Sequence, residues 1–343
     1  MIDSSPWMLW LGPAALAAWA LTGLARRYAL ARNVMDVPNG RSSHSQPTPR
    51  GGGLGFVLAY LAALALLAPM GGWPAGQVWS LAAAGAWVAA VGALDDHRPV
   101  PARWRLLAHI LGAALVLHGI GLPAALSGQH WLPGWLAAPV LVLALAWGLN
   151  LYNFMDGIDG LAAIEAVSVA GLGALLSAAA GAGLLAGLAG LLACTVLGFL
   201  PWNFPRARIF MGDGGSGFLG LMLGGLCLLA AAWSAELMWA WLILPGVFVA
   251  DATVTLLRRL LRGEALHQAH RTHAYQYAAR RWRSHPRVTL AALAINVLWL
   301  GPWAAAAAWG HVCGPLAWLA AYLPLVLLAV RLGAGRPEAP AAG

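Results

Sequence analysis

Long apolar runs separated by short polar segments make up most of this 343-residue chain. Eleven of these runs are close to the roughly 20 residues that a helix needs to cross the hydrocarbon core of a bilayer. The predicted spans are 7–25, 52–69, 77–94, 104–122, 133–149, 160–180, 183–200, 216–233, 237–257, 288–309 and 312–330. Residues 160–200 form one Ala/Gly/Leu stretch, which we divide near Gly181–Gly183. The pattern predicts an all-α integral membrane protein with about 11 transmembrane helices.

The arginines fall on one side of these spans, because the predicted loops alternate between loops with arginine and loops without it. The arginines of that side are Arg26, Arg27, Arg32, Arg41, Arg50, Arg98, Arg103, Arg105, Arg206, Arg208, the run from Arg258 to Arg287, Arg331 and Arg336. Basic loops tend to remain in the cytoplasm. We therefore expect a periplasmic N-terminus and a cytoplasmic C-terminus.

The composition supports one multi-pass membrane domain covering residues 1–343. Apolar residues make up 61% of the chain and charged residues 9%, whereas a soluble domain carries about a quarter charged residues. Topology explains the net charge of +8 better than nucleic-acid binding does, since the basic residues sit in particular loops. Cys194, Cys227 and Cys313 lack metal-ligand spacing and are expected to be packing residues. Asp3 and the lack of a basic start favour a retained first span.

The acidic residues gather on the same side as the arginines. Those near this face are Asp36, Asp95, Asp96, Asp156, Asp159, Asp213 and Asp251, while Asp3 and Glu236 map to the other face. Carboxylates near a bilayer are costly and usually functional. The predicted catalytic loops are 26–51, 95–103, 150–160, 201–216 and 258–287. The sequence thus predicts an active site at the cytoplasmic face.

Asp95 and Asp96 end the third predicted span. Two adjacent carboxylates repel each other, so both stay ionised only beside a cation or an arginine. Otherwise one of them becomes a candidate base. The alternative is a solvated helix end that pairs with Arg98 or Arg103.

Asn150, Asn153, Asp156 and Asp159 recur at every third position between two apolar spans. Neighbours in such a series share a helix face. The glycine after each aspartate allows a break that turns both carboxylates toward one pocket. The alternative is an ordinary capped loop, with one aspartate capping the next helix.

A glycine-rich turn containing Gly212, Asp213 and Ser216 precedes the eighth predicted span. Such a turn entering a helix offers backbone N–H groups to a phosphate, and Asp213 supplies an oxygen ligand for Mg²⁺. The alternative is a simple helix N-cap.

Two basic loops are candidates for phosphate recognition. His270, Arg271 and His273 lie in the last long loop, where no cysteine or acidic partner completes a zinc site, and arginine suits a diphosphate. Arg41 and Arg50 lie in a first loop rich in proline, glycine and hydroxyl groups. The alternatives are a solvated basic loop and a loop that only sets topology.

Together these clusters resemble the polyprenyl-phosphate N-acetylhexosamine-1-phosphate transferases of glycosyltransferase family 4, from Asp36 to Gln276. The resemblance implies a multi-helix enzyme of the bacterial inner membrane that depends on Mg²⁺, with Mn²⁺ as an alternative. Such enzymes transfer a sugar-1-phosphate from a UDP-sugar to undecaprenyl phosphate and release UMP. The resemblance also admits a homodimer.

The resemblance assigns roles to residues of this chain. Asp95 and Asp96 match the paired aspartates of the family, Asp213 matches its metal ligand, and His273 matches its histidine loop. The remaining matches and substrate-binding candidates are Asn153, Asp156, Asp159, Arg41, Arg50, Gly212, Ser216, His270 and Arg271.

From these roles we expect metal-assisted phosphoryl transfer. Asp213, helped by Asp96 or Asp156, holds the metal, and Asp95 deprotonates or orients the lipid phosphate. His273 and Arg271 contact the donor phosphates. A two-step route through an aspartyl-phosphate uses the same residues.

The lipid I branch of the family has three consecutive histidines, whereas this chain has His270-Arg271-Thr272-His273. This difference favours the branch that begins O-antigen and other surface polysaccharides, whose donors are UDP-GlcNAc or its 6-deoxy relatives. A MurNAc-pentapeptide donor is the alternative. Three rival classes fit less well: a CDP-alcohol phosphotransferase, an aromatic prenyltransferase and a lipid-linked sugar flippase. Asp251 is either a pocket residue or a partner for Arg258, and the role of Glu165 is left open.

Overall fold

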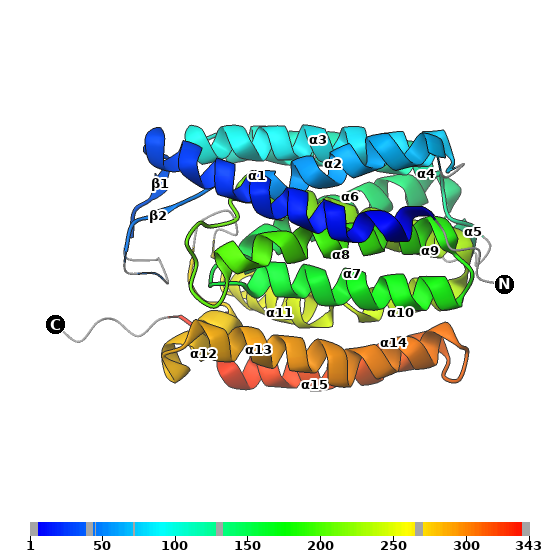
Figure 1. The fold of residues 1–343 in the computed structure, drawn as a ribbon. Helices are drawn as coiled ribbons and strands as arrows, with labels where there is room; N and C mark the ends of the chain where they lie inside the picture. The colour runs from blue at the N-terminus through cyan, green and yellow to red at the C-terminus, as the bar shows by residue number, and fades with distance from the viewer. Residues whose placement is uncertain are drawn as a thin grey trace.

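The computed structural model describes residues 6–38, 44, 46–70, 73–127, 133–264 and 270–337. The helices, in chain order, are η1 (Pro6–Trp10), α1 (Leu11–Ala31), α2 (Leu54–Met70), α3 (Ala75–His97), α4 (Ala102–Ile120), α5 (Ala124–Ser127), α6 (Gly134–Met155), α7 (Leu161–Ala179), α8 (Gly183–Asn203), α9 (Asp213–Trp233), α10 (Ala235–Ile243), α11 (Gly246–Leu261), α12 (Ala274–Trp282), α13 (His285–Ile295), η2 (Asn296–Leu300), α14 (Gly301–Ala308) and α15 (Gly314–Leu332). The long helices run side by side in one bundle (Figure 1).

This helical bundle confirms an all-α membrane protein. Within the described ranges, eight helices are long and apolar enough to cross a membrane, or nine if the bent pair α10–α11 counts as one span. The count of eleven stays a prediction. Two of the expected spans coincide with α2, which has only 17 residues, and with α4, which carries Arg103, Arg105 and two histidines.

The division of residues 160–200 into two helices is confirmed. Helix α7 ends at Ala179 and α8 begins at Gly183, with Gly181 between them at a φ of 75°. The ninth expected span, 237–257, is wrong as a single helix, because α10 and α11 meet at an angle of 66°. Pro245 lies at this break, and proline removes a helical hydrogen bond and clashes with the preceding turn.

Close helix packing depends on glycines at the contacts. A Cβ atom on Gly198 of α8 would lie 2.1 Å from the carbonyl oxygen of Ala15 in α1. A Cβ atom on Gly220 of α9 would lie 2.6 Å from the Cα atom of Leu149 in α6. Small residues let membrane helices approach in this way. On the outside, Leu175 and Leu298 are 69% and 75% exposed, as expected for side chains that face lipid.

The polar loops meet at one end of the bundle. Helices α3, α6 and α8 end there, and α7 and α9 begin there, beside the short antiparallel pair of β1 (Met35–Asp36) and β2 (Thr48–Pro49) (Figure 1). This β pair was not predicted. Helix α1 begins at the opposite end of the bundle from the end at which α15 finishes.

Candidate active site

The turn before α9 brings the first and the third of the predicted polar clusters together, namely Asp95–Asp96 and the turn that contains Asp213. Gly212 has a φ of 79°, and a Cβ atom there would lie 2.4 Å from Oδ2 of Asp96. Glycine is favoured at such a position, since it tolerates positive φ and lets two chain segments approach closely. The turn allows the backbone N–H of Asp213 to donate to Oδ1 of Asp96 over 3.1 Å. The predicted meeting of Asp96 and Asp213 is therefore present in the structure.

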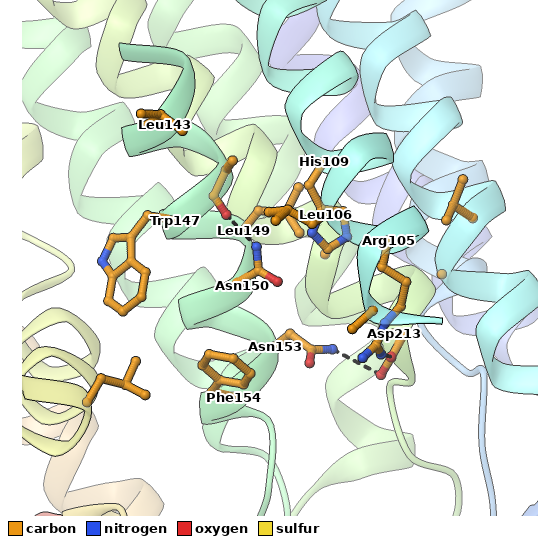
Figure 2. Close-up of a pocket in the computed structure, with 16 residues that line it drawn as sticks. Arg105, Leu106, His109, Leu143, Trp147, Leu149, Asn150, Asn153, Phe154 and Asp213 are labelled. Carbon is orange, nitrogen blue, oxygen red and sulfur yellow. Dashed lines mark hydrogen bonds and ion pairs between the residues drawn. The ribbon is translucent and has the colours of Figure 1, made fainter. Parts of the chain in front are cut away.

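Asp213 is the centre of a polar network at the start of α9. Its Oδ1 accepts a hydrogen bond from the amide of Asn153 at 2.9 Å, and this amide also donates to Ser216 at 3.0 Å. Its Oδ2 lies 3.3 Å from Nη1 of Arg105. Figure 2 shows Arg105 and Asn153 pointing toward Asp213 from two different helices. The motif residues Asn153, Asp213 and Ser216 thus form one cluster.

Arg105 is a site residue that the sequence reasoning used only for topology. Its Nη1 lies 2.6 Å from Oδ2 of Asp95, while the other oxygen of Asp95 accepts from the backbone N–H of Val100, also at 2.6 Å. One guanidinium therefore joins Asp95 to Asp213. The sequence did contain an indication of this role: Arg105 lies in the first turn of an apolar helix, at the same membrane face as the aspartates.

Two cavities meet at Asp213. The apolar groove has a volume of about 410 Å³ and runs along side chains such as Leu106, Leu143, Trp147 and Leu256, with Arg105 and Asn153 at its polar end (Figure 2). The acidic cavity has a volume of about 210 Å³. Its lining consists of Asp36, His44, Arg50, Asp96, Asp156, Gly157, Ile158, Asp159, Asn203, Phe210, Gly212, Asp213 and His285. Asp213 thus faces an apolar and a polar compartment.

Carboxylates crowd the acidic cavity. Asp156 follows α6, and its pKa is raised to about 7 by burial and then by the nearby charges of Asp213, Asp96 and Asp159. Arg50 offsets part of this charge, because its Nε lies 4.0 Å from Oδ1 of Asp96; its guanidinium also donates to the backbone carbonyl oxygen of Asp96. A cation bound here would relieve the repulsion that remains.

The residues present fit a divalent metal that arrives with a phosphorylated ligand. Oδ2 of Asp96 is buried and has no hydrogen-bond partner in the described part of the chain. Among the same residues, no group of three or more His, Cys, Asp or Glu side chains is arranged to hold a metal by itself. Mg²⁺ typically takes only one or two carboxylates, together with water and substrate phosphates. Asp213, Asp96 and Asp156 are the carboxylates that could supply these ligands.

A third cavity adjoins the acidic one. This arginine cavity has a volume of about 650 Å³ and is lined by Asp159, Pro205, Arg206, Arg271, Gln276, Ala279, Arg280, Arg283, Ser284, His285 and Pro286. The two cavities share Asp159 and His285, whose Oδ2 and Nδ1 atoms lie 3.4 Å apart. His285 was not anticipated from the sequence. The structure brings Arg271 to this neighbouring cavity.

The histidines of the last loop lie apart from these cavities. His273 precedes α12, has only 2% exposure and lies with its Nδ1 3.3 Å from Oδ1 of Asp251. The pKa of His270 is lowered to about 3, mainly by burial and then by His273 and Arg259. Neither ring lines any of the three cavities, so phosphate contacts by these histidines stay a prediction. Arg41 lies outside the described residues.

The contact between α3 and α9 gives a direct test of the position of Asp213. A Cβ atom on Gly92 would lie 2.5 Å from the backbone carbonyl of Asp213, which has no room to move aside. Gly92→Ala should therefore lower the free energy of unfolding by about 1–3 kcal/mol, as overpacking does, and should impair any reaction at Asp213. Gly171→Ala is the matched control, since nothing lies within 4 Å of the added Cβ atom. Equal thermal midpoints for the two variants would contradict this close contact.

Comparison with known proteins identifies the relatives of the chain. The model of glycosyl transferase family 4 matches residues 78–231. A probable undecaprenyl-phosphate N-acetylglucosaminyl 1-phosphate transferase of Bacillus subtilis is 30% identical, covering 76% of this chain and 74% of the relative. A decaprenyl-phosphate N-acetylglucosaminephosphotransferase of Mycolicibacterium smegmatis is 32% identical, covering 84% and 78%.

Relatives with a second kind of donor are also similar. A phospho-N-acetylmuramoyl-pentapeptide-transferase of Synechococcus is 37% identical over 72% of this chain and 73% of the relative. The relatives match over most of the length of each protein, and the residues matched by the family model include Asp95, Asp156 and Asp213. On these grounds the chain belongs to glycosyl transferase family 4.

Proposed function

We infer that this protein transfers the sugar-1-phosphate of a UDP-N-acetylhexosamine to a polyprenyl phosphate such as undecaprenyl phosphate. An oxygen of the lipid phosphate attacks the β-phosphorus of the donor. The bond between that phosphorus and the bridging oxygen breaks, and UMP leaves with the bridging oxygen. The observation that carries this proposal is the position of Asp213 between an apolar groove and an acidic cavity.

The apolar groove suits the isoprenoid acceptor. Its walls are apolar side chains, and its polar end carries Arg105, whose guanidinium suits a phosphate monoester. Both oxygens of Asp95 are already engaged, one by Arg105 and one by Val100. This arrangement supports the orienting role predicted for Asp95, because a carboxylate held in this way fixes the guanidinium that meets the acceptor.

The acidic cavity suits the donor diphosphate. When bound, Mg²⁺, or Mn²⁺ in its place, would neutralise charge on the departing UMP phosphate. Asp213, with Asp96 or Asp156, would hold that ion, and Asn153 keeps the Asp213 carboxylate in place through its 2.9 Å hydrogen bond. The donor is larger than this cavity, so its remaining part would extend past Asp159 into the adjoining arginine cavity.

Metal removal tests this arrangement. Asp96, Asp156 and Asp213 line one cavity, but in the described ranges no three His, Cys, Asp or Glu side chains are arranged to hold a metal without a bound ligand. Chelation with EDTA should therefore abolish UMP release, and added Mg²⁺ should restore it with Mn²⁺ as a weaker substitute. Full activity after extensive chelation and dialysis would contradict a metal role.

Donor identity is tested with a panel of UDP-sugars. The named transferases of Bacillus and Mycolicibacterium favour UDP-GlcNAc, and we place the reaction at the start of O-antigen or another surface polysaccharide. Purified protein, undecaprenyl phosphate and Mg²⁺ are incubated with donors labelled in the sugar, and lipid-extractable label is counted. Label from UDP-GlcNAc or a 6-deoxy relative supports this donor class. Label only from UDP-MurNAc-pentapeptide would assign the chain to the other branch.

The active face belongs on the cytoplasmic side of the bacterial inner membrane. The loops around Asp95, Asp156 and Asp213 lie on the side that the arginines mark. In a variant that lacks Cys194, Cys227 and Cys313, one cysteine introduced at an exposed position of this face should react with a membrane-impermeant thiol reagent in inverted vesicles. Reaction only in right-side-out vesicles would contradict this orientation. A homodimer stays a prediction.

A further inference from the structure

Asp251 lies in α11 and does not line the acidic cavity, yet its side chain is buried, with 5% exposure. It does not pair with Arg258, whose Nη1 instead donates to the carbonyl oxygen of Ala334 at 2.9 Å. Its carboxylate faces the start of α12. A buried carboxylate in an apolar helix needs partners that stabilise its charge.

Those partners are the first N–H groups of α12. Oδ1 of Asp251 accepts from the backbone N–H of Ala274 at 2.8 Å, and Oδ2 accepts from that of Tyr275 at 2.9 Å. The first N–H groups of a helix have no partner within the helix. A carboxylate from a different helix therefore caps α12, and the same Oδ1 lies 3.3 Å from Nδ1 of His273.

The cap fixes a stack of rings. His273 stacks on His270, with ring centroids 4.9 Å apart, and on Tyr275, with centroids 5.6 Å apart. Because Asp251 holds the N–H groups of residues 274 and 275 and the ring of His273, it determines where this stack lies.

Tyr275 connects α12 to the segment that lines the acidic cavity. Its hydroxyl donates to the carbonyl oxygen of Phe154 at 3.1 Å, and a Cβ atom on Gly157 would lie 2.1 Å from that hydroxyl. Both contacts are with the segment that contains Asp156. A displacement of α12 would therefore remove the support behind Asp156.

We propose that Asp251 is a positioning residue for the donor site. By capping α12 it holds Tyr275 in contact with the Phe154–Gly157 segment, and this contact determines the position of Asp156. This inference rests on the proposed function for its kinetic consequence. Asp251 touches neither the groove nor the acidic cavity. Its loss should weaken donor binding without affecting the acceptor.

The test uses Asp251→Asn, with Thr255→Val as the matched control. The hydroxyl of Thr255 donates to Oδ1 of Asp251 over 3.1 Å, so Thr255→Val removes a hydrogen bond of Asp251 but leaves the carboxylate that caps α12. Asp251→Asn should raise KM for the UDP-sugar about tenfold, as loss of a charge-assisted hydrogen bond does, while KM for polyprenyl phosphate stays unchanged. Thr255→Val should leave both values near those of the wild type. A fall in kcat alone, with both KM values unchanged, would mean a merely structural role and would overturn the proposal.

Hydrogen exchange separates this proposal from the proposed function. Asp251→Asn should speed amide exchange in residues 270–282 and also in residues 153–160. Faster exchange in the first segment alone would overturn the link to Asp156, whether or not the wild type transfers any sugar. If Asp251→Asn does not fold, Tyr275→Phe replaces it, because it removes only the hydroxyl contact with Phe154. That variant should speed exchange in residues 153–160 and raise KM for the donor, and unchanged values for both would equally refute the proposal.

Discussion

Asp213→Asn should reduce metal-dependent UMP release by about a thousandfold and leave the protein folded. A metal ion contributes several kcal/mol to stabilising a phosphoryl-transfer transition state, and each 1.4 kcal/mol is a factor of ten in rate. The amide is nearly isosteric with the carboxylate, so the turn at Gly212 and the contact with Asn153 have room to persist. It also removes one of the charges that crowd Asp156. The thermal midpoint should therefore stay the same or rise.

Glu236→Gln is the control for this substitution. It makes the same chemical change at an exposed position in the first turn of α10. UMP release at saturating Mg²⁺ and thermal unfolding in detergent are measured for both variants. Near-normal turnover of Asp213→Asn would remove Asp213 from the metal site, and a large drop in its thermal midpoint would mean that the carboxylate is mainly structural.

Arg105→Ala should slow transfer about a hundredfold and raise KM for the polyprenyl phosphate. The guanidinium joins Asp95 to Asp213 and ends the apolar groove, so its loss leaves two carboxylates facing the incoming phosphate. Removing one preorganised donor to a reacting centre costs about 10²–10³ in rate. Arg105→Lys should recover part of the rate, because lysine supplies the charge but not the forked geometry.

Arg103→Ala is the matched control for Arg105. It lies two residues away in the same helix, and its guanidinium lies over the ring of Trp104, 5.7 Å from the centroid. Steady-state rates at varied acceptor and varied donor separate the two KM values. Equal kinetics for Arg103→Ala and Arg105→Ala would show that Arg105 has no special role. A rise in KM for the donor alone would place Arg105 in the donor compartment instead.

The acidic cluster was largely predictable from the sequence. Asp96, Asp156 and Asp213 lie at the ends of apolar spans that share one face, so counting spans and arginines was enough to bring them together. Gly212 indicated a tight turn in the sequence. The structure explains why glycine is needed there, since only a residue without Cβ fits beside Asp96.

The partners of these carboxylates were not predictable. The pairing of Arg105 with Asp95 and that of His285 with Asp159 depend on how α4 and α13 are rotated, which hydropathy does not report. The break at Pro245 was missed because the apolar run continues through it. For Asp251 the sequence did not distinguish a pocket role from a pairing with Arg258. Its actual partners are N–H groups of α12, more than 20 residues away in sequence.

Transfer of the β-phosphorus is the most direct test of the proposed reaction. UDP-GlcNAc, or the donor that the panel selects, is labelled with ³²P at the β-phosphate and incubated with purified protein, undecaprenyl phosphate and Mg²⁺. Transfer of a sugar-1-phosphate predicts that the label enters the lipid extract and that one UMP appears for each labelled lipid. Label that stays in the aqueous phase as UDP, while the sugar moves to the lipid, would contradict attack at the β-phosphorus and with it the proposed function.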